Sequence, residues 1–182
     1  MKRYSNSRSS NSGQSRLTGW TDRLASTLHN ELIAIRQLVN LSSQQTTALV
    51  SNDLTRINRI VEQQAESNRR LAGLEYERVK MTAELASYLG VLPEKAQALS
   101  LREIEEMLPD PTRRRISTQR KDLKRLMHRL HQTNTLNSVL IGNILELINQ
   151  TVQEIVRLAT TPPGYGGRAQ SEGATLYLDT KA

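Results

Sequence analysis

Apolar residues recur every three or four positions over residues 24–49 and again over residues 54–89, the spacing that places them on one face of an α-helix. Residues 51–53, Ser-Asn-Asp, separate the two stretches, and Asp53 is suited to cap the second helix. Two long helices joined by so short a turn must lie antiparallel, because each has an apolar stripe that needs a partner. The pattern therefore predicts a helical hairpin.

Two further helical segments follow the hairpin. Ser100 and Glu103 stand ahead of a short apolar pattern as a capping box and predict a short helix that ends at Pro109. After Pro111 the same apolar spacing continues to Ala159 and predicts one last long helix. The long segments contain no proline, in keeping with its cost of about 3 kcal/mol inside a helix.

The predicted fold class is all-α: an elongated antiparallel helical hairpin or bundle of three long helices and one short helix, with coiled-coil-like packing. This bundle domain would occupy residues 20–161. Residues 1–19 are rich in Ser, Asn and Arg and predict a disordered basic tail, because they cannot bury enough apolar surface to offset the entropy of ordering. Pro-Pro-Gly ends the last helix and opens a flexible C-terminal tail over residues 162–182.

Composition narrows the classes of function. The chain has 182 residues, no Cys and three His, which excludes disulfides, thiolate zinc sites and Cys nucleophiles. His128 and His131 stand three apart, but the cations beside them repel a metal ion. No glycine-rich phosphate loop opens a helix. We therefore expect a non-enzyme with no cofactor, no metal and no small-molecule substrate.

The hydropathy of the chain bears on its location. No apolar run approaches the roughly 20 residues that span a bilayer. The N-terminus also lacks the apolar stretch of a secretory signal. We therefore expect a cytoplasmic protein with no integral membrane segment.

The net charge of +7 is concentrated in one block. Residues 111–131 carry eight Lys and Arg against one Asp, while the +4 of residues 1–21 is cancelled elsewhere. Such a block can follow a phosphate backbone, but no aromatic residue lies between Tyr88 and Tyr165 to stack on a base. Nucleic acid therefore ranks below a solvated bundle end or an acidic protein partner.

The C-terminal half of the last helix is apolar over an arc of roughly 200° at 100° per residue, whereas a surface helix needs a stripe a little over about 100° wide. The excess predicts two neighbouring helices, a groove for a partner's amphipathic helix, or a homodimer seam. We favour the partner helix and expect it against the following residues. They are Leu140, Ile141, Ile144, Ile148, Val152 and Ile155.

Polar residues interrupt or follow this apolar pattern at three positions. Asn134 and Asn137 lie on the otherwise apolar face, and a buried amide costs a few kcal/mol unless it is hydrogen-bonded. Such residues fix register and partner choice, so the pair forms either an internal polar layer or a determinant read by a partner helix. Tyr165 stands in a Pro/Gly-rich stretch with no core to pack into and is either a recognition anchor or idle.

These features together resemble the FlgN family of flagellar type III export chaperones. The resemblance begins with Asn134-x-x-Asn137-x-x-Leu140, followed by a long apolar helix, a Pro/Gly break and Tyr165 with Gly166 and Gly167. In the hairpin it rests on Leu32, Leu49, Asp53 and Leu54, and on the run Leu71-x-x-Leu74-Glu75-x-x-Arg78. It covers roughly residues 22–168, whereas the tail before Leu17 and the basic block at 113–129 are not part of the family pattern.

The resemblance implies a cytosolic chaperone that binds the C-terminal helical region of FlgK- or FlgL-like hook-filament junction proteins. The client would contact the six apolar residues named above, with Asn134 and Asn137 setting its register. Tyr165 would dock the complex on the cytoplasmic domain of the export gate. The residues alone leave two alternatives: a basic coiled-coil nucleic-acid-binding protein and a structural homodimeric coiled coil.

Overall fold

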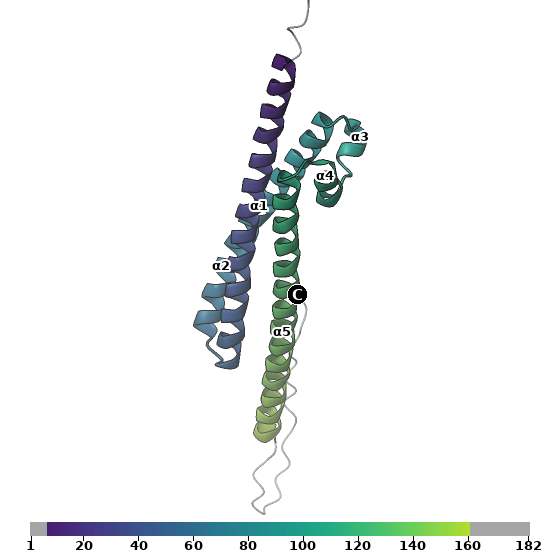
Figure 1. Cartoon of the computed structure of the whole chain (residues 1–182). Helices are drawn as coiled ribbons and strands as arrows, with labels where there is room; N and C mark the ends of the chain where they lie inside the picture. The colour runs from purple at the N-terminus through teal and green to yellow at the C-terminus, as the bar shows by residue number, and fades with distance from the viewer. Residues whose placement is uncertain (1–6, 161–182) are drawn as a thin grey trace, which may run out of the picture. The chain divides into compact units, whose positions relative to one another are not determined.

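The structure is a computed structural model that describes the backbone of residues 7–160 and the side chains from residue 15 onward. Within these residues the chain forms five helices and no strand, which confirms the all-α class (Figure 1). They are α1 (Ser7–Val50), α2 (Leu54–Tyr88), α3 (Pro93–Ala96), α4 (Leu101–Met107) and α5 (Thr112–Thr160). No helix among them is long and apolar enough to cross a membrane.

The chain divides after Asn143 into two units. The first unit holds α1 to α4 and the N-terminal part of α5, and the described part of the second is the C-terminal part of α5.

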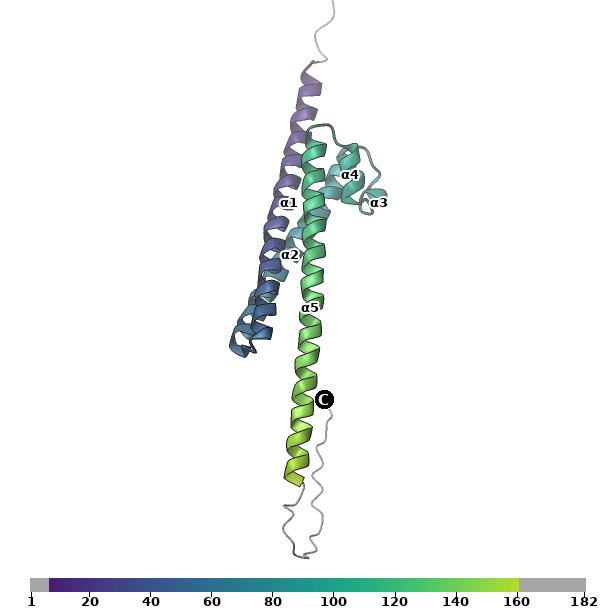
Figure 2. The same ribbon diagram turned by 60° about the horizontal axis from the view of Figure 1, so that its bottom comes forward.

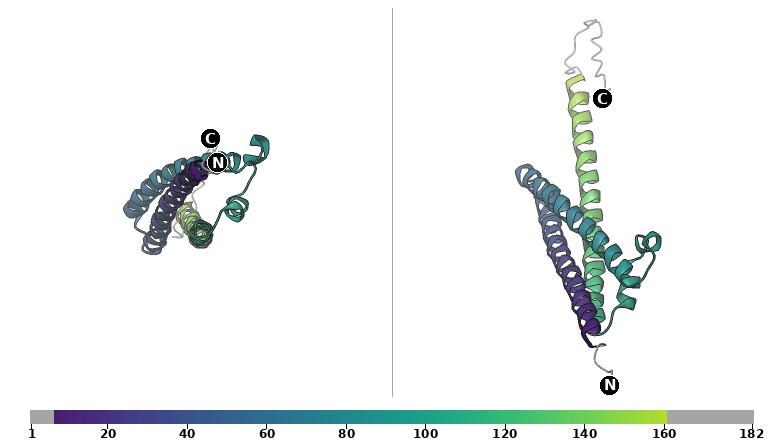
Figure 3. Two further views of the ribbon diagram at one scale, coloured as in Figure 1. Left: turned by 45° about the horizontal axis from the view of Figure 1, so that its top comes forward. Right: turned by 90° about the horizontal axis from the view of Figure 1, so that it is seen from above.

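The hairpin is formed by α1 and α2, which lie side by side and run in opposite directions (Figure 3). Its turn has the predicted chemistry. The Asp53 carboxylate accepts a hydrogen bond from the backbone N–H of Arg56 at 2.9 Å and so caps α2. Asn52 adopts a positive φ of 52°, a conformation that asparagine tolerates better than most residues. Local sequence thus determines this turn.

The main hydrophobic core lies at the end of the hairpin away from its turn. Residues from all five helices meet there, so α3 and α4 fasten the start of α5 to the hairpin. Its buried members are Leu24, Ala25, Leu28, Leu85, Ala86, Ala96, Ile104, Leu108 and Ile116. A smaller cluster of Leu41, Ala48 and Ile60 joins α1 to α2 near the turn.

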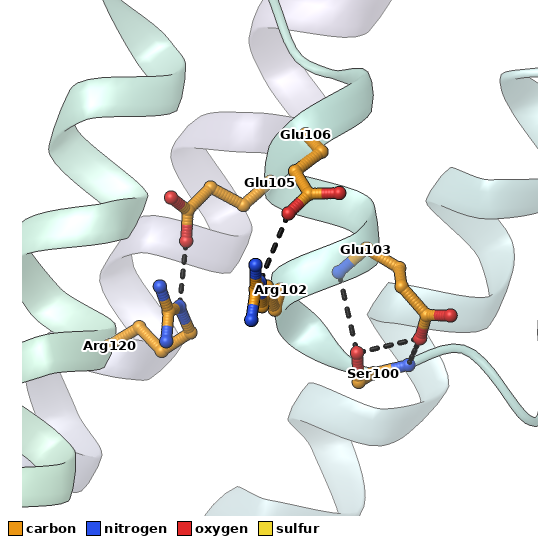
Figure 4. Close-up of polar contacts among 6 residues, drawn as sticks. All are labelled: Ser100, Arg102, Glu103, Glu105, Glu106 and Arg120. Carbon is orange, nitrogen blue, oxygen red and sulfur yellow. Dashed lines mark hydrogen bonds and ion pairs between the residues drawn. The ribbon is translucent and has the colours of Figure 1, made fainter.

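The connection between α2 and α5 contains one element that the sequence predicted and one that it did not. Ser100 and Glu103 form the expected capping box at the start of α4 (Figure 4). Hydrogen bonds from Ser100 lower the pKa of Glu103. The sequence does not predict the short α3, which has Pro93 in its first turn, because four residues are too few to show a helical period.

The start of α1 also differs from the expectation. α1 begins at Ser7, within residues 1–19, where the sequence predicts no regular structure. Leu17 and Trp20 are partly buried against the main core, and the Arg23 guanidinium lies 5.2 Å from the centre of the Trp20 ring. These tertiary contacts favour helix upstream of residue 20, although the local composition does not. The tail predicted at residues 162–182 lies outside the described residues.

Candidate functional site

The N-terminal part of α5 packs along α1 in the first unit (Figure 2). Ile116 is buried in the main core. The Gln119 amide donates a hydrogen bond to the carbonyl of Ala25 at 2.9 Å, and Arg115 forms a salt bridge of 3.0 Å with Asp22. These contacts fix the register of α5 on α1 at this end.

Asn137 belongs to a buried polar layer further along the same contact. Its side chain is 3% exposed. The amide nitrogen donates to the Ser42 carbonyl at 2.9 Å and to Gln45 Oε1 at 3.1 Å, and Oδ1 accepts from the Thr46 hydroxyl at 2.6 Å. Of the two alternatives that the sequence left open, the structure therefore has the internal polar layer at Asn137.

Asn134 lies at the edge of this layer. Its Oδ1 accepts a hydrogen bond from the Ser42 hydroxyl at 2.7 Å, while the residue stays exposed. Gln64 of α2 donates to Ser42 Oγ at 3.3 Å and to Gln45 Oε1 at 3.2 Å, so the layer joins α1, α2 and α5. A shallow depression of about 270 Å³ opens beside it, lined by Gln45, Gln64, Asn134, Asn137, Ser138 and Ile141.

The α1 members of the layer were missed in the sequence, although a signal for them exists. Ser42, Gln45 and Thr46 take three positions of α1 where the apolar stripe is interrupted between Leu41 and Ala48. Polar residues within the apolar stripe of one helix indicate hydrogen bonding to Asn residues within the apolar stripe of another helix, because buried polar groups need partners. What the sequence lacks is the information that these segments, more than 90 residues apart, meet.

A buried ion pair joins α1 to α2 away from the layer. Glu31 has a side chain that is 2% exposed, and its carboxylate accepts hydrogen bonds from Arg78 Nε at 2.9 and 3.2 Å. Burial raises the pKa of Glu31, and the positive charge of Arg78 acts in the opposite direction. This pair gives a physical role to the Leu-Glu-Arg run of α2, because the run ends on the arginine that neutralises Glu31.

The second unit contains four of the predicted site residues, Ile144, Ile148, Val152 and Ile155, on the C-terminal stretch of α5. Seven large apolar side chains in this stretch of α5 are each more than half exposed, with values from 51 to 65%. They are Leu145, Leu147, Ile148, Val152, Ile155, Val156 and Leu158. Ile144 is half-buried. We call this set of seven the apolar face of α5.

The eight predicted client-binding residues thus divide into three groups. Ile148, Val152 and Ile155 belong to the apolar face, and Ile144 adjoins it. Leu140 and Ile141 belong to the first unit, half-buried and 38% exposed respectively. The two asparagines pair with α1, as described above. Tyr165 lies outside the described residues.

No group of three or more His, Asp and Glu among residues 15–160 is arranged to hold a metal ion. A salt bridge of 2.7 Å joins Glu105 of α4 to Arg120 of α5, and Figure 4 shows the two side chains pointing toward each other. Within residues 15–160, no side chain covers the apolar face of α5, whose seven members stay exposed.

Comparison with known proteins supplies the family. No curated protein and no solved structure matches the chain. The FlgN protein family matches residues 20–173, which is most of the chain. The chain therefore belongs to the FlgN family, whose members are flagellar export chaperones.

Proposed function

We propose that this chaperone binds, in the cytoplasm, the C-terminal helical region of hook-filament junction proteins of the FlgK and FlgL type, and that the apolar face of α5 is the binding surface. The observation that carries the proposal is the exposure of seven large apolar side chains along one stretch of helix, residues 145–158. Apolar patches of this kind mark interaction sites. An amphipathic client helix offers the complementary stripe, with anchors three and four residues apart.

The energetics of such a contact are sufficient. Burying one Val, Leu or Ile side chain contributes roughly 1.5–3 kcal/mol. A micromolar complex needs about 8 kcal/mol of net binding free energy, part of which offsets the loss of translational and side-chain freedom. Ile148, Val152, Ile155 and their neighbours therefore provide enough apolar contact for a reversible complex.

The role proposed for the two asparagines changes with their geometry. Because Asn137 is buried and fully engaged with α1, it acts on the client indirectly, by holding α5 in register on the hairpin. Asn134 is exposed beside the shallow depression and is the one of the two that is accessible to a client. Leu140 and Ile141 of the first unit and Ile144 of the second remain proposed client contacts.

Co-purification with a junction protein tests the binding surface. Ile148→Asp with Val152→Asp places two charges in the apolar face and should abolish capture of the client while leaving the helical content near normal. The matched control is Val61→Asp with Val79→Asp, two exposed valines of α2 at 47 and 48% exposure, which should leave capture unchanged. Equal capture by the α5 variant and the wild type would rule out the apolar face as the client site.

The homodimeric coiled coil is distinguished by sedimentation. The client proposal expects the apolar face to be available to a client helix at working concentrations. A stable homodimer that resists excess client and dissociates in the Ile148→Asp, Val152→Asp variant would favour the structural alternative.

We also propose that Tyr165 docks the chaperone–client complex on the cytoplasmic domain of the export gate. The support is the resemblance of the Pro/Gly break and Tyr165 to the family's tail. Tyr165→Ala should leave client capture intact and stop secretion of the junction protein, and Tyr165→Phe should show how much of the effect belongs to the hydroxyl. Normal secretion by Tyr165→Ala would remove this residue from the mechanism.

A further inference from the structure

The outer face of the N-terminal part of α5 carries a row of basic residues. Placed at roughly 100° per residue, Arg114, Lys121, Lys124, Arg125 and His128 lie within about 60° of one line along the helix. Arg129 borders the row. All six of these residues are exposed in the structure. We call these six residues the basic stripe.

The basic stripe has no packing role in the first unit. The residues of α5 that contact the hairpin, among them Ile116, Gln119 and Asn137, lie on the opposite side of the helix. Substituting a stripe residue therefore leaves the core and the polar layer in place. Because the fold does not need these side chains, they remain available to an external partner.

Neighbouring carboxylates neutralise the basic stripe incompletely. Arg114 pairs with Asp110 at 3.5 Å and Arg125 with Asp122 at 3.0 Å, and the two arginine side chains remain 81 and 76% exposed. Exposed pairs of this kind are weak and exchange readily for other anions. Among the described residues, Lys124 and Arg129 have no salt bridge. The stripe thus keeps a net positive charge.

We propose that the basic stripe docks the chaperone on an anionic lipid surface. From Arg114 to Arg129 the stripe is about 22 Å long at 1.5 Å per residue, and its cations face one way, as contact with a flat surface requires. Each Lys or Arg near an anionic leaflet adds to binding, and the attraction decays within a Debye length. This inference concerns a different surface from the apolar face and stands independently of client binding.

The chemistry of the stripe favours lipid headgroups over nucleic acid. Single-stranded nucleic acid needs aromatic side chains for stacking, and the stripe has none. A straight helix crossing a duplex meets phosphates near the crossing point, whereas a flat leaflet meets every cation of the stripe. The stripe itself contains no apolar side chain to insert between lipids, so the contact is electrostatic, reversible and sensitive to salt.

Vesicle sedimentation with the full chain tests this proposal. The probes are phosphatidylcholine vesicles with and without about one third phosphatidylglycerol, and a 20-base-pair RNA duplex in a parallel titration. The stripe variant is Lys121→Glu, Lys124→Glu, Arg129→Glu. Its control, Arg56→Glu, Arg59→Glu, Arg70→Glu, makes the same change in net charge at exposed positions of α2.

The proposal expects the wild type to sediment with the anionic vesicles at low salt, to remain in solution with the neutral ones, and to be released by 0.5 M NaCl. The stripe variant should lose at least about tenfold in partitioning and the control much less. Equal losses in the two variants, no sedimentation of the wild type, or tighter binding to the RNA duplex than to the vesicles would overturn it. Capture of a junction protein by the stripe variant should be normal, which separates this test from that of client binding.

Discussion

At the scale of single residues, polar side chains hold α5 on the hairpin with a specificity that apolar packing lacks. Asn137 uses both ends of its amide on α1, and a shift of α5 along α1 would leave these groups buried without partners. A buried polar group without a partner costs about 1–3 kcal/mol, which penalises every alternative register. The layer therefore selects one arrangement of the first unit.

Asn137→Ala should lower the free energy of unfolding by about 2–3 kcal/mol, because it removes the three hydrogen bonds that the amide makes to Ser42, Gln45 and Thr46 of α1. Urea denaturation followed by circular dichroism measures the change. Asn149→Ala, an exposed amide on the same helix, is the control and should change stability by less than about 0.5 kcal/mol. Similar effects of the two substitutions would show that the layer does not stabilise the fold.

The Glu31–Arg78 pair makes stability depend on pH. Burial raises the pKa of Glu31 above its ordinary value of 4.5, so the folded state holds this proton more tightly than the unfolded state does. The stabilisation that comes from protonating Glu31 in the folded state is therefore fully present below pH 4.5. It is lost as the pH rises through the raised pKa. Glu31→Gln should flatten this part of the profile of unfolding free energy against pH.

Arg78→Ala should cost about 3 kcal/mol at neutral pH, because it leaves a buried carboxylate without its cation. The cost should shrink toward pH 4, where Glu31 is protonated and no longer needs a positive partner. Unfolding experiments at the two pH values measure the difference. A cost that is the same at both would contradict the assignment of Glu31 as a buried, ionised partner of Arg78.

At the scale of the elements, local signals determine where helices begin and end. Asp53→Ala removes the cap of α2 and should destabilise the protein by about 1 kcal/mol, whereas Asp53→Asn, which keeps an acceptor oxygen, should cost little. Thermal denaturation compares the two variants. Equal melting temperatures for Asp53→Ala and the wild type would contradict the capping role.

Features that depend on nearby residues were predicted from the sequence, whereas features that depend on contacts between distant segments were not. The cap at Asp53 and the box at Ser100 and Glu103 were found because each lies within four residues of the helix it caps. The partners of Asn137, the Glu31–Arg78 pair and the helical residues before Trp20 were not found, because each depends on contacts between segments far apart in the chain. In the candidate site, the apolar face was evident from the width of its arc alone.

At the scale of the whole molecule, the chain combines a well-packed first unit with an exposed apolar stretch of helix. All five helices contribute to the main core, whereas the described residues after Ile144 are exposed throughout. Exposed apolar side chains of this kind are suited to reversible binding of a partner protein. We propose the client helix as that partner.

Amide hydrogen exchange on the free chaperone and on its complex with the C-terminal helical segment of a FlgK- or FlgL-like protein tests this central claim most directly. In the free protein, amides of residues 145–158 should exchange faster than those of the buried part of α1, because no tertiary packing protects them. Adding the client segment should slow exchange at residues 145–158 and leave α2 unchanged. Protection confined to the hairpin, with α5 unaffected, would contradict the account.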